Sequence, residues 1–584
     1  MISSTPTRRW YRLLALLLGL AMVAAACGGN DDDGDAAPEG EGSGEESTST
    51  TEPVDEGEPV QGGRLVYAVE ADVASPWTPQ NVVCDISCHM IMRTVFDSMA
   101  LWVEGPEGDP VVVPNLLESF EPNEDYTEWT LTPRAGILFH DGTPFDAAAI
   151  KANLDGHLTS FLTGKALADV ASVEVVGDAA VVKMDRPWAH FPGYLTGQVG
   201  YIASPTWLAA VAAGTAQPDQ PVGTGPFVFE SYQPGGSFVA TRNPTYWRAD
   251  EGLPHLDAVE MRVVADTQAR RTALLNGELD MTHTSSGDTI AQFREDDGIE
   301  LTEDTMYGEA SYILLNNANP DSAIQDVRIR RALAHALDRE VLIERRGGGI
   351  AEPANGPFGD GQLGELEDTG YPEFDQEKAR ELVEEYKADE GIDGPVPISY
   401  TTTSDPASLG TAELLKQFWD AVGFETEIAQ IEQSRFIVTA LQGDFEAFGW
   451  RNHGGYNPDG QRYWWHSEAA DCGIRDTCPD GGDPGLALNF GRIRDPEIDA
   501  SLDRIRETPD MEVVKEEAEN ISRRFGEQVW NLWTSETVWG WAKQPYVNGL
   551  ASWTAPDGSK VLNFNGFGGA HGIVNLWCAD GTCG

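Results

Sequence analysis

The stretch Trp129–Asn153 restricts the possible fold more than any other part of the sequence. Trp129–Leu131 alternates apolar and polar residues as a strand does, and after a proline- and glycine-containing turn Ile137–Phe139 predicts a strand that pairs back. We expect Thr143 to cap a helix that begins directly after it, with Asp146 in its first turn, where the helix dipole favours a carboxylate. The stretch therefore predicts a strand–turn–strand–helix unit.

Composition excludes several classes of partner. The 584 residues allow two to four domains, and the hydrophobic fraction of 41% is enough for a large core. Against 95 acidic residues stand only 39 lysines and arginines, which speaks against binding nucleic acid or anionic lipid electrostatically. An acidic, lysine-poor surface suits saline surroundings, although the base composition of the genome explains few lysines equally well.

The N-terminus is typical of an export signal. Three arginines precede the uncharged apolar run Leu13–Val23, which is shorter than the about 20 residues that span a membrane comfortably. The small residues Ala24–Ala26 then end directly at Cys27, an arrangement that resembles a bacterial lipobox. We therefore predict a lipoprotein signal peptide over 1–26 and lipidation of Cys27, with ordinary secretion as the alternative.

Residues 27–61 are predicted to be a disordered, acidic tether. Twelve acidic residues and no basic residue lie between Asp31 and Glu58, separated by Gly, Ser, Thr and Pro. Such a segment buries too little apolar surface to offset its conformational entropy, and its charges repel one another.

The remaining six cysteines fall into three close pairs, and the spacing fits no common zinc signature. In an exported chain, local disulfides are favoured over a zinc site, which stays the alternative. The predicted disulfide cysteines are Cys84 and Cys88, Cys472 and Cys478, and Cys578 and Cys583.

Four motifs, in this order along the chain, carry a resemblance to a known family, and the first of them lies within Trp129–Asn153. They are Phe-His-Asp-Gly-Thr-Pro-Phe at 139–145, Gly-Thr-Gly-Pro-Phe at 223–227, Ala-Leu-Leu-Asn-Gly-Glu-Leu-Asp at 273–280, and Asp-Val-Arg-Ile-Arg-Arg-Ala-Leu-Ala-His-Ala-Leu-Asp-Arg at 326–339. Together they resemble the family 5 extracellular solute-binding proteins, the peptide, oligopeptide, dipeptide and nickel receptors of ABC importers. The resemblance covers about residues 62 to 550.

The resemblance implies an α/β fold: a two-lobed clamp of the periplasmic-binding-protein type II, with mixed sheets and an extra subdomain in the first lobe. Lobe I is expected at 62–310, including an inserted subdomain at about 81–221. Lobe II is expected at 311–528, and 529–584 returns to lobe I. Independently of the family, Ile398–Thr402, Ala412–Val422 and Glu425–Ile431 predict a strand–helix–strand unit with parallel strands.

The implied function is that of a binding protein that closes on a peptide-like or other compact polar solute and delivers it to ABC permease subunits. It implies no catalytic step, no cofactor and no metal. We expect a monomer, exported and held by its lipid on the outer face of the cytoplasmic membrane or in the periplasm, with no other membrane contact and no nucleic acid.

The candidate ligand-binding residues cluster after Gly449. In peptide-binding relatives an aspartate follows the matching Gly-Trp and pairs with the peptide's amino group, but here the segment reads Arg-Asn-His-Gly-Gly-Tyr, and Asp459 comes later. An arginine fork favours an anionic or hydrogen-bond-accepting group instead. A packed aromatic core is the alternative interpretation of this cluster, and for Trp77 packing within its own lobe is at least as well supported. The predicted residues are Trp77, Tyr307, Trp450, Arg451, Asn452, His453, Tyr456 and Trp464.

Two other functional classes stay open. A secreted hydrolase acting on saccharides would use paired carboxylates, which the sequence cannot place in space. The sequence has neither a Gly-x-Ser-x-Gly nor a His-Glu-x-x-His motif. A ligand sensor built on the same fold would differ only in the partner that recognises its closed, ligand-bound form.

Overall fold

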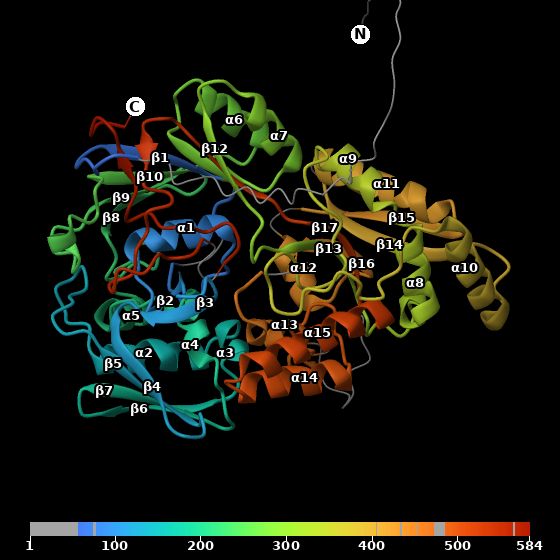
Figure 1. The fold of residues 1–584 in the computed structure, drawn as a ribbon, viewed down its shortest axis with the longest axis horizontal. Coiled ribbons are helices and arrows are strands. Elements are labelled where there is room, and N and C mark those ends of the chain that lie inside the picture. The colour runs from blue at the N-terminus through green and yellow to red at the C-terminus, as the bar shows by residue number, and fades with distance from the viewer. Residues whose placement is uncertain are drawn as a thin grey trace, which may run out of the picture. The chain divides into compact units, whose positions relative to one another are not determined.

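Two mixed β-sheets, assembled from different parts of the chain, form the framework of the folded region (Figure 1). The computed structural model describes residues 56–73, 77–404, 406–432, 435–451, 454–471, 473, 485–563 and 567–583. The predicted signal peptide, Cys27 and most of the predicted tether lie outside the described residues. Helices and strands alternate along much of the described chain, so the predicted α/β class is confirmed.

The first sheet has seven strands and combines N-terminal with C-terminal segments. In order across the sheet they are β12 (Glu300–Asp304), β18 (Trp539–Lys543), β11 (Met281–Thr284), β1 (Arg64–Val69), β10 (Ala258–Val263), β9 (Ser237–Arg242) and β8 (Phe227–Tyr232). β1 pairs in parallel with β10 and β11, whereas β18 runs antiparallel to its neighbours β11 and β12. β1 is central and reads as a nearly continuous apolar run, which is typical of a strand buried on both faces.

The second sheet has five strands from the later part of the chain. In order they are β15 (Phe424–Ile431), β14 (Val396–Thr403), β16 (Ala447–Arg451), β13 (Ala310–Leu315) and β17 (Asn531–Glu536). β14 and β15 pair in parallel through α11 (Pro406–Asp420), which confirms the predicted strand–helix–strand unit.

The chain crosses between the sheets twice in the segments that join consecutive strands. The first crossing runs from β12 to β13, and the second runs from β17 to β18. Because β17 pairs with β13, the return to the first sheet begins only after Glu536. The predicted boundary at 529 is therefore too early.

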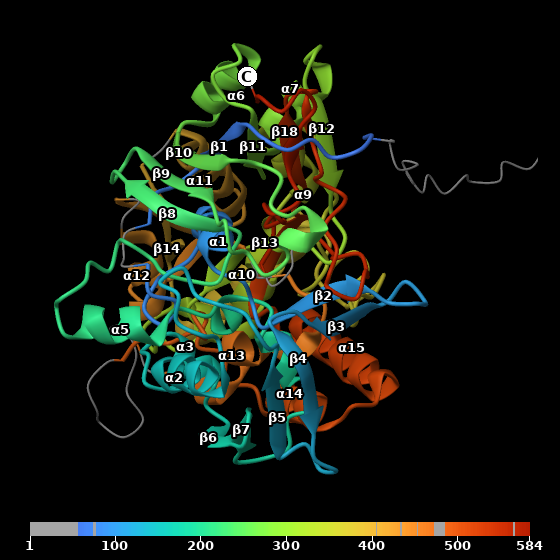
Figure 2. The same ribbon diagram turned by 90° about the vertical axis from the view of Figure 1, so that its left-hand side faces the viewer.

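Each sheet has its own hydrophobic core. The core of the second sheet contains buried residues from Ala310 to Trp533, whereas the core of the first sheet draws on residues near both ends of the folded chain and also includes Tyr456. We call residues 56–309 with 537–583 the first half, and residues 310–536 the second half. Figure 1 shows the strands of the two sheets in separate regions, and Figure 2 gives the view from the side of the first sheet, with β8, β9 and β10 toward the viewer.

A third core, from Met99 to Ile202, lies within the range 81–221 expected for an inserted subdomain. Its sheet has the order β4 (Leu117–Pro122), β5 (Glu128–Pro133), β7 (Ala179–Met184), β6 (Val170–Val176). Further elements of this region are β2 (Ala100–Glu104), β3 (Pro110–Pro114), α2 (Ala147–Leu158), α3 (Thr163–Ala166), α4 (Phe191–Tyr194) and α5 (Pro205–Ala212).

The stretch Trp129–Asn153 differs from its prediction in two details. After β5, residues 137–139 form no strand, and only an isolated bridge joins Leu138 to Pro144. The helix α2 is capped by Asp146, whose side chain accepts from the amide of Ala149, and not by Thr143. Thr143 instead donates from its hydroxyl to Asp141 at 2.5 Å. Both residues are good caps, so local sequence alone did not decide between them.

Helices complete both halves. Besides α2, α3, α4 and α5 of the 81–221 region, the first half contains α1 (Ile86–Val95), α6 (Thr267–Leu275) and α7 (Gly287–Glu295). Those of the second half are α8 (Val327–Ala336), α9 (Arg339–Arg346), α10 (Gln376–Glu390), α11, α12 (Phe436–Gln442), α13 (Arg462–Trp465), α14 (Pro496–Glu507) and α15 (Met511–Gln528). None of the helices described is long and apolar enough to cross a membrane.

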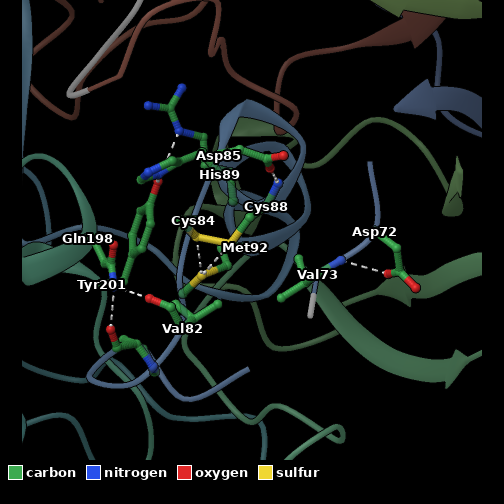
Figure 3. Close-up of a disulfide and its surroundings, with 12 residues drawn as sticks. Asp72, Val73, Val82, Cys84, Asp85, Cys88, His89, Met92, Gln198 and Tyr201 are labelled. Atoms are coloured by element: carbon green, nitrogen blue, oxygen red, sulfur yellow. Dashed lines mark hydrogen bonds between the residues drawn. A yellow bond between two sulfur atoms is a disulfide. The ribbon is translucent and has the colours of Figure 1, made fainter. Parts of the chain in front are cut away.

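Two of the predicted cysteine pairs are bonded within the first half. The Cys84–Cys88 disulfide lies at the start of α1, where Asp85 caps the helix by accepting from the amide of Cys88 at 2.9 Å (Figure 3). The sulfur of Met92 lies 3.5 Å from that of Cys84. Cys578 is bonded to Cys583, where β20 (Trp577–Cys578) pairs with β19 (Val547–Asn548). Cys472 and Cys478 lie outside the described residues.

Candidate functional site

A cavity of about 290 Å³ lies against the second sheet, and both halves of the fold line it. The second half contributes residues of β13, β16 and β17 together with side chains of α9 and α11. The first half contributes Ser285, Ser286 and Gly287, which follow β11 and begin α7. This is the candidate ligand site, because pockets form preferentially where two lobes meet.

The missing side chain of Gly449 leaves room for part of this cavity. Gly449 lies two residues after Ala447, the strand partner of Tyr400, so Gly449 and Tyr400 share one face of the sheet. A Cβ atom on Gly449 would lie 2.6 Å from the hydroxyl of Tyr400. Any side chain at this position would displace Tyr400 or fill the space above it.

Arg451, the last residue of β16, lines the cavity and lies close to residues at both crossings between the sheets. Its Nη1 donates to Oγ of Ser285 in the first half at 2.6 Å. Its guanidinium carbon lies 5.1 Å from the ring centroid of Trp539, the first residue of β18, and Nη1 lies 3.7 Å from Oε2 of Glu309, just before β13. One side chain therefore contacts a loop of the first half and residues of both connecting segments.

The carboxyl groups near the cavity are poorly solvated. Burial raises the pKa of Glu309, and the nearby Arg451 only partly opposes the rise. Burial also raises the pKa of Glu536, which lines the cavity, to about 7, and Asp360 and Glu365 act in the same direction. Both carboxyl groups therefore ionise less readily than exposed ones.

Trp450 belongs both to the cavity wall and to an aromatic cluster on the second sheet. Its ring stacks on Phe436 with centroids 5.0 Å apart and packs edge-on against Phe490. Trp464 also packs against Phe490, with centroids 5.2 Å apart, and it does not line the 290 Å³ cavity. For Trp464 the structure thus supports the alternative interpretation, an aromatic core.

Tyr307 and Tyr456 come together in a second aromatic cluster away from the cavity. Their ring centroids are 4.9 Å apart, and Tyr456 also lies 5.3 Å from Trp102 of β2. Tyr456 belongs to the second half and the other two to the first, so this cluster joins the halves. Neither tyrosine lines the cavity.

Trp77 lies in the core of the first half. It is 1% exposed and packs against Tyr232 and Phe238, with centroids 5.5 and 5.3 Å apart. In this structure Trp77 therefore packs within its own half and does not line the 290 Å³ cavity. The predicted site residues Asn452 and His453 lie outside the described residues.

Both carboxylate oxygens of Asp459 accept hydrogen bonds from other side chains of the protein. It is 1% exposed, its Oδ1 accepts from Nε of Arg506 at 2.9 Å, and its Oδ2 accepts from the indole nitrogen of Trp188 at 2.8 Å. The guanidinium of Arg506 also lies 3.9 Å from the ring centroid of Trp188. An aspartate held in this way is not available to a ligand's amino group.

Around this pair an ion cluster joins the inserted region of the first half to the second half. Arg506 of α14 also donates to Asp169 at 2.6 Å, and Arg186 donates to Asp169, Asp503 and Glu468 at 2.8 to 3.0 Å. Burial disfavours the Asp169 carboxylate, but Arg506 and Arg186 outweigh it and hold its pKa below the ordinary value. The members of this ion cluster are Asp169, Arg186, Asp459, Arg462, Glu468, Asp503 and Arg506.

Several of these residues were not predicted as functional. Ser285 and Arg346, which also line the cavity, carry no motif, and the ion-cluster pairs that join the two halves are 282 to 337 positions apart in sequence. For Arg346 the sequence offers only a weak signal: it directly precedes the glycine run Gly347–Gly349. This run follows the end of α9, and Gly347 lies close to Gly287 of the first half. Across the described ranges no group of three or more His, Cys, Asp or Glu side chains could hold a metal ion.

Comparison with known proteins agrees with this architecture. The H. pylori peptide-binding protein DppA, solved with the peptide STSA, superposes with a TM-score of 0.74 at 19% identity, covering 89% of this chain and 99% of DppA. The agropinic acid complex of AgaA from A. tumefaciens R10 gives a TM-score of 0.73 at 21% identity, covering 88% and 99%. The predicted two-lobed fold is thereby confirmed.

Sequence comparison identifies the family. The glutathione-binding protein GsiB of Salmonella paratyphi A is 28% identical over 321 residues, which is 54% of this chain and 59% of GsiB. The chain thus aligns with little more than half of that relative's length. Residues 111–471 match the middle region of the bacterial extracellular solute-binding proteins of family 5. The chain therefore belongs to the bacterial extracellular solute-binding proteins, family 5.

Proposed function

We propose that this protein is the substrate-binding component of an ABC importer, which closes on a peptide-like or other compact polar solute and delivers it unchanged to membrane permease subunits. No chemical step is part of this function. The observation that carries the proposal is the cavity between two separately packed halves that only two strand crossings connect.

Two crossings are a suitable hinge for opening and closing. Apart from Tyr456, which packs into the core of the first half, each half keeps its own core, so the halves can rotate as rigid bodies while the crossing segments change their backbone angles. A ligand that contacts both halves binds the closed form more tightly and so shifts the equilibrium toward it. A permease that prefers the closed form would then distinguish a loaded from an empty binding protein.

The ion cluster supports closure at the far side of the interface from the cavity. Its pairs join Asp169 and Arg186 of the inserted region to α14 and neighbouring loops of the second half. Partly exposed pairs contribute little singly, but Arg506 and Asp459 are buried and desolvated. These contacts form only when the halves meet, so they favour the closed form.

The ligands named for relatives set the range of solutes. GsiB is described as a glutathione-binding protein. DppA was solved with the peptide STSA and AgaA with agropinic acid. The shared fold therefore accepts both peptides and other solutes. In this chain we assign ligand contact first to Trp450 and Arg451, which line the cavity. Asn452 and His453 follow directly in sequence and stay candidates, whereas Tyr307, Tyr456 and Trp464 would support the site without lining it.

Export and anchoring belong to the same proposal. The signal sequence would direct the chain across the cytoplasmic membrane, and lipid on Cys27 would hold it there through the acidic 27–61 tether. A monomer on such a tether can reach a neighbouring permease while remaining attached.

Native mass spectrometry of the protein purified from its producing cells tests the proposal, since a carried solute would appear as a mass increment. Small-angle scattering with and without that solute should then report closure. Trp450→Ala and Arg451→Ala should weaken binding without loss of fold, whereas Arg435→Ala, an exposed arginine on the same half, should not. Unchanged scattering with saturating solute, or its chemical conversion, would refute the proposed function.

A further inference from the structure

A main-chain contact between two glycines joins the halves beside the cavity. Gly287 begins α7 of the first half, Gly347 directly follows α9 of the second half, and both residues line the cavity. A Cβ atom on Gly287 would lie 2.0 Å from the carbonyl oxygen of Gly347 and 2.7 Å from its carbonyl carbon. Both distances are far inside van der Waals contact, so a side chain at position 287 is incompatible with this arrangement of the halves.

The requirement for glycine at position 287 comes from the other half. The three atoms nearest to the added Cβ atom are all main-chain atoms of Gly347. Gly287 itself has no positive φ, and it is the first residue of a helix, where alanine is favoured over glycine. Within the first half alone an alanine would therefore fit, and the contact with the second half explains the glycine.

The glycine run that follows α9 is shaped for the same contact. Gly348 adopts a φ of +63°, which favours glycine, and a Cβ atom there would lie 3.0 Å from the carbonyl oxygen of Gly287. The amides of Gly347 and Gly349 both donate to the carbonyl of Ile343, at 2.8 and 3.1 Å. These bonds tie the run to the last turn of α9 and restrict how far it can move away from position 287.

The facing segment of the first half is held by hydrogen bonds as well. The amide of Ser286 donates to Oγ1 of Thr284, the last residue of β11, at 3.1 Å. The amides of Thr289 and Ile290 donate to the carbonyl of Ser286, at 3.0 and 2.9 Å. Both sides of the glycine contact are thus main chain fixed by its own half, and relieving a clash there requires the halves to move relative to each other.

We propose that Gly287 is a positioning residue for closure: its contact with Gly347 sets how closely the two halves approach at the cavity, and thereby the space that they leave for a solute. The inference rests on the proposed function and names the residue that limits its closing motion. A side chain at position 287 would act as a wedge between the halves. Because a solute gains affinity from contacts with both halves in the closed form, the wedge would weaken its binding.

Gly287→Ala and Gly287→Val test the wedge in the full chain. The probe is a low-molecular-weight extract of the producing cells, and native mass spectrometry measures the fraction of protein that has taken up a solute from it. We expect Gly287→Ala to need about tenfold more extract for half-occupancy, an effect typical of overpacking, and Gly287→Val to need still more. Small-angle scattering of the loaded proteins should give both variants a larger radius of gyration.

The matched control is Gly394→Ala. Gly394 is exposed and has no positive φ, and its added Cβ atom would meet no described atom within 4 Å. This variant should take up solute and scatter as the natural protein does. Thermal melting then separates the wedge from a merely structural role. Because the halves can part to relieve the clash and alanine suits the start of α7, Gly287→Ala should melt close to the natural protein.

The outcomes distinguish this inference from the function on which it rests. If both Gly287 variants matched the natural protein in half-occupancy and in scattering, the inference would be overturned and the importer function would stand. A lowered melting temperature with unchanged scattering would also overturn it, because the contact would then belong to a fixed structure. If the natural protein took up no solute and scattered identically in extract and in buffer, the proposed function would fail, and the inference with it.

Discussion

Nε of Arg506 donates to Oδ1 of Asp459 at 2.9 Å, and both side chains are almost completely buried, at 2% and 1% exposed. The pair lies where the inserted region of the first half meets the second half, because Trp188 and Asp169 complete its hydrogen bonds. The same contact withdraws Asp459 from the ligand site.

Replacing Arg506 should destabilise the protein strongly. Arg506→Gln leaves Asp459 and Asp169 buried without a cation, a change that typically lowers the free energy of unfolding by about 3 to 5 kcal/mol. Urea denaturation followed by tryptophan fluorescence measures the loss. Arg523→Gln, which breaks an exposed pair with Glu519, is the control and should change stability by about 1 kcal/mol or less. Equal losses in both variants would contradict the role of the buried pair.

Replacing Arg186 should act on closure more than on folding. Its side chain is 24% exposed and contacts Asp503 and Glu468 of the second half. Arg186→Gln should lower the closed population of the ligand-free protein about fivefold, which corresponds to roughly 1 kcal/mol. Small-angle scattering should show a larger radius of gyration for the variant, and 1 M salt should enlarge the natural protein similarly by screening. Superimposable curves for variant and natural protein would refute this.

Glu536 should make stability decrease as the pH rises. Its pKa is about 7 in the folded protein against an ordinary 4.5, so the folded state binds the extra proton between these values. Unfolding is then progressively less costly from about pH 4.5 to pH 7, and the loss is complete above pH 7. Glu536→Gln should therefore be more stable than the natural protein at pH 8, by on the order of 2 kcal/mol, and equal to it near pH 4. Thermal melts at both pH values measure this.

The control for this titration is Glu107→Gln, at an exposed turn. It should shift the melting temperature equally little at both pH values. A Glu536→Gln variant whose advantage did not grow from pH 4 to pH 8 would contradict the raised pKa.

Gly449 should tolerate alanine only if Tyr400 loses its hydroxyl. A Cβ atom there would lie 2.6 Å from that oxygen, and overpacking of this kind destabilises by about 1 to 3 kcal/mol. Tyr400→Phe on the Gly449→Ala background should recover most of the loss, which a double-mutant cycle of unfolding free energies measures. Additive losses would show that the hydroxyl is not the obstacle.

Sequence patterns predict the local secondary structure well where the spacing of apolar residues and the turn residues indicate the same element. The β6–β7 hairpin turns at Gly177, a residue type that readily adopts the positive φ found there, +63°. The parallel strands β14 and β15 followed from a right-handed crossover and were equally predictable. The predicted helix cap was wrong, because α2 is capped by Asp146 and not by Thr143. Both residue types cap helices well, so the local sequence does not distinguish between these two positions.

The candidate site was predicted in part. Trp450 and Arg451 were selected from the sequence and both line the cavity, whereas Trp77 is in the core and Tyr307, Tyr456 and Trp464 lie in aromatic clusters. An aromatic side chain suits a core and a ligand wall equally, so residue type alone does not separate these positions. Burial separates them, and burial depends on the surrounding elements.

Sequence motifs identify the family, and local patterns predict single units such as β14, α11 and β15 and the arginine at position 451. These features depend on residues close together in the chain, or on motifs that are read one at a time. The hydrogen bonds from Arg506 to Asp459 and from Arg451 to Ser285 could be found only from the three-dimensional fold. Such pairs span long separations, and their energies depend on burial and distance, which exist only once the halves have packed against each other.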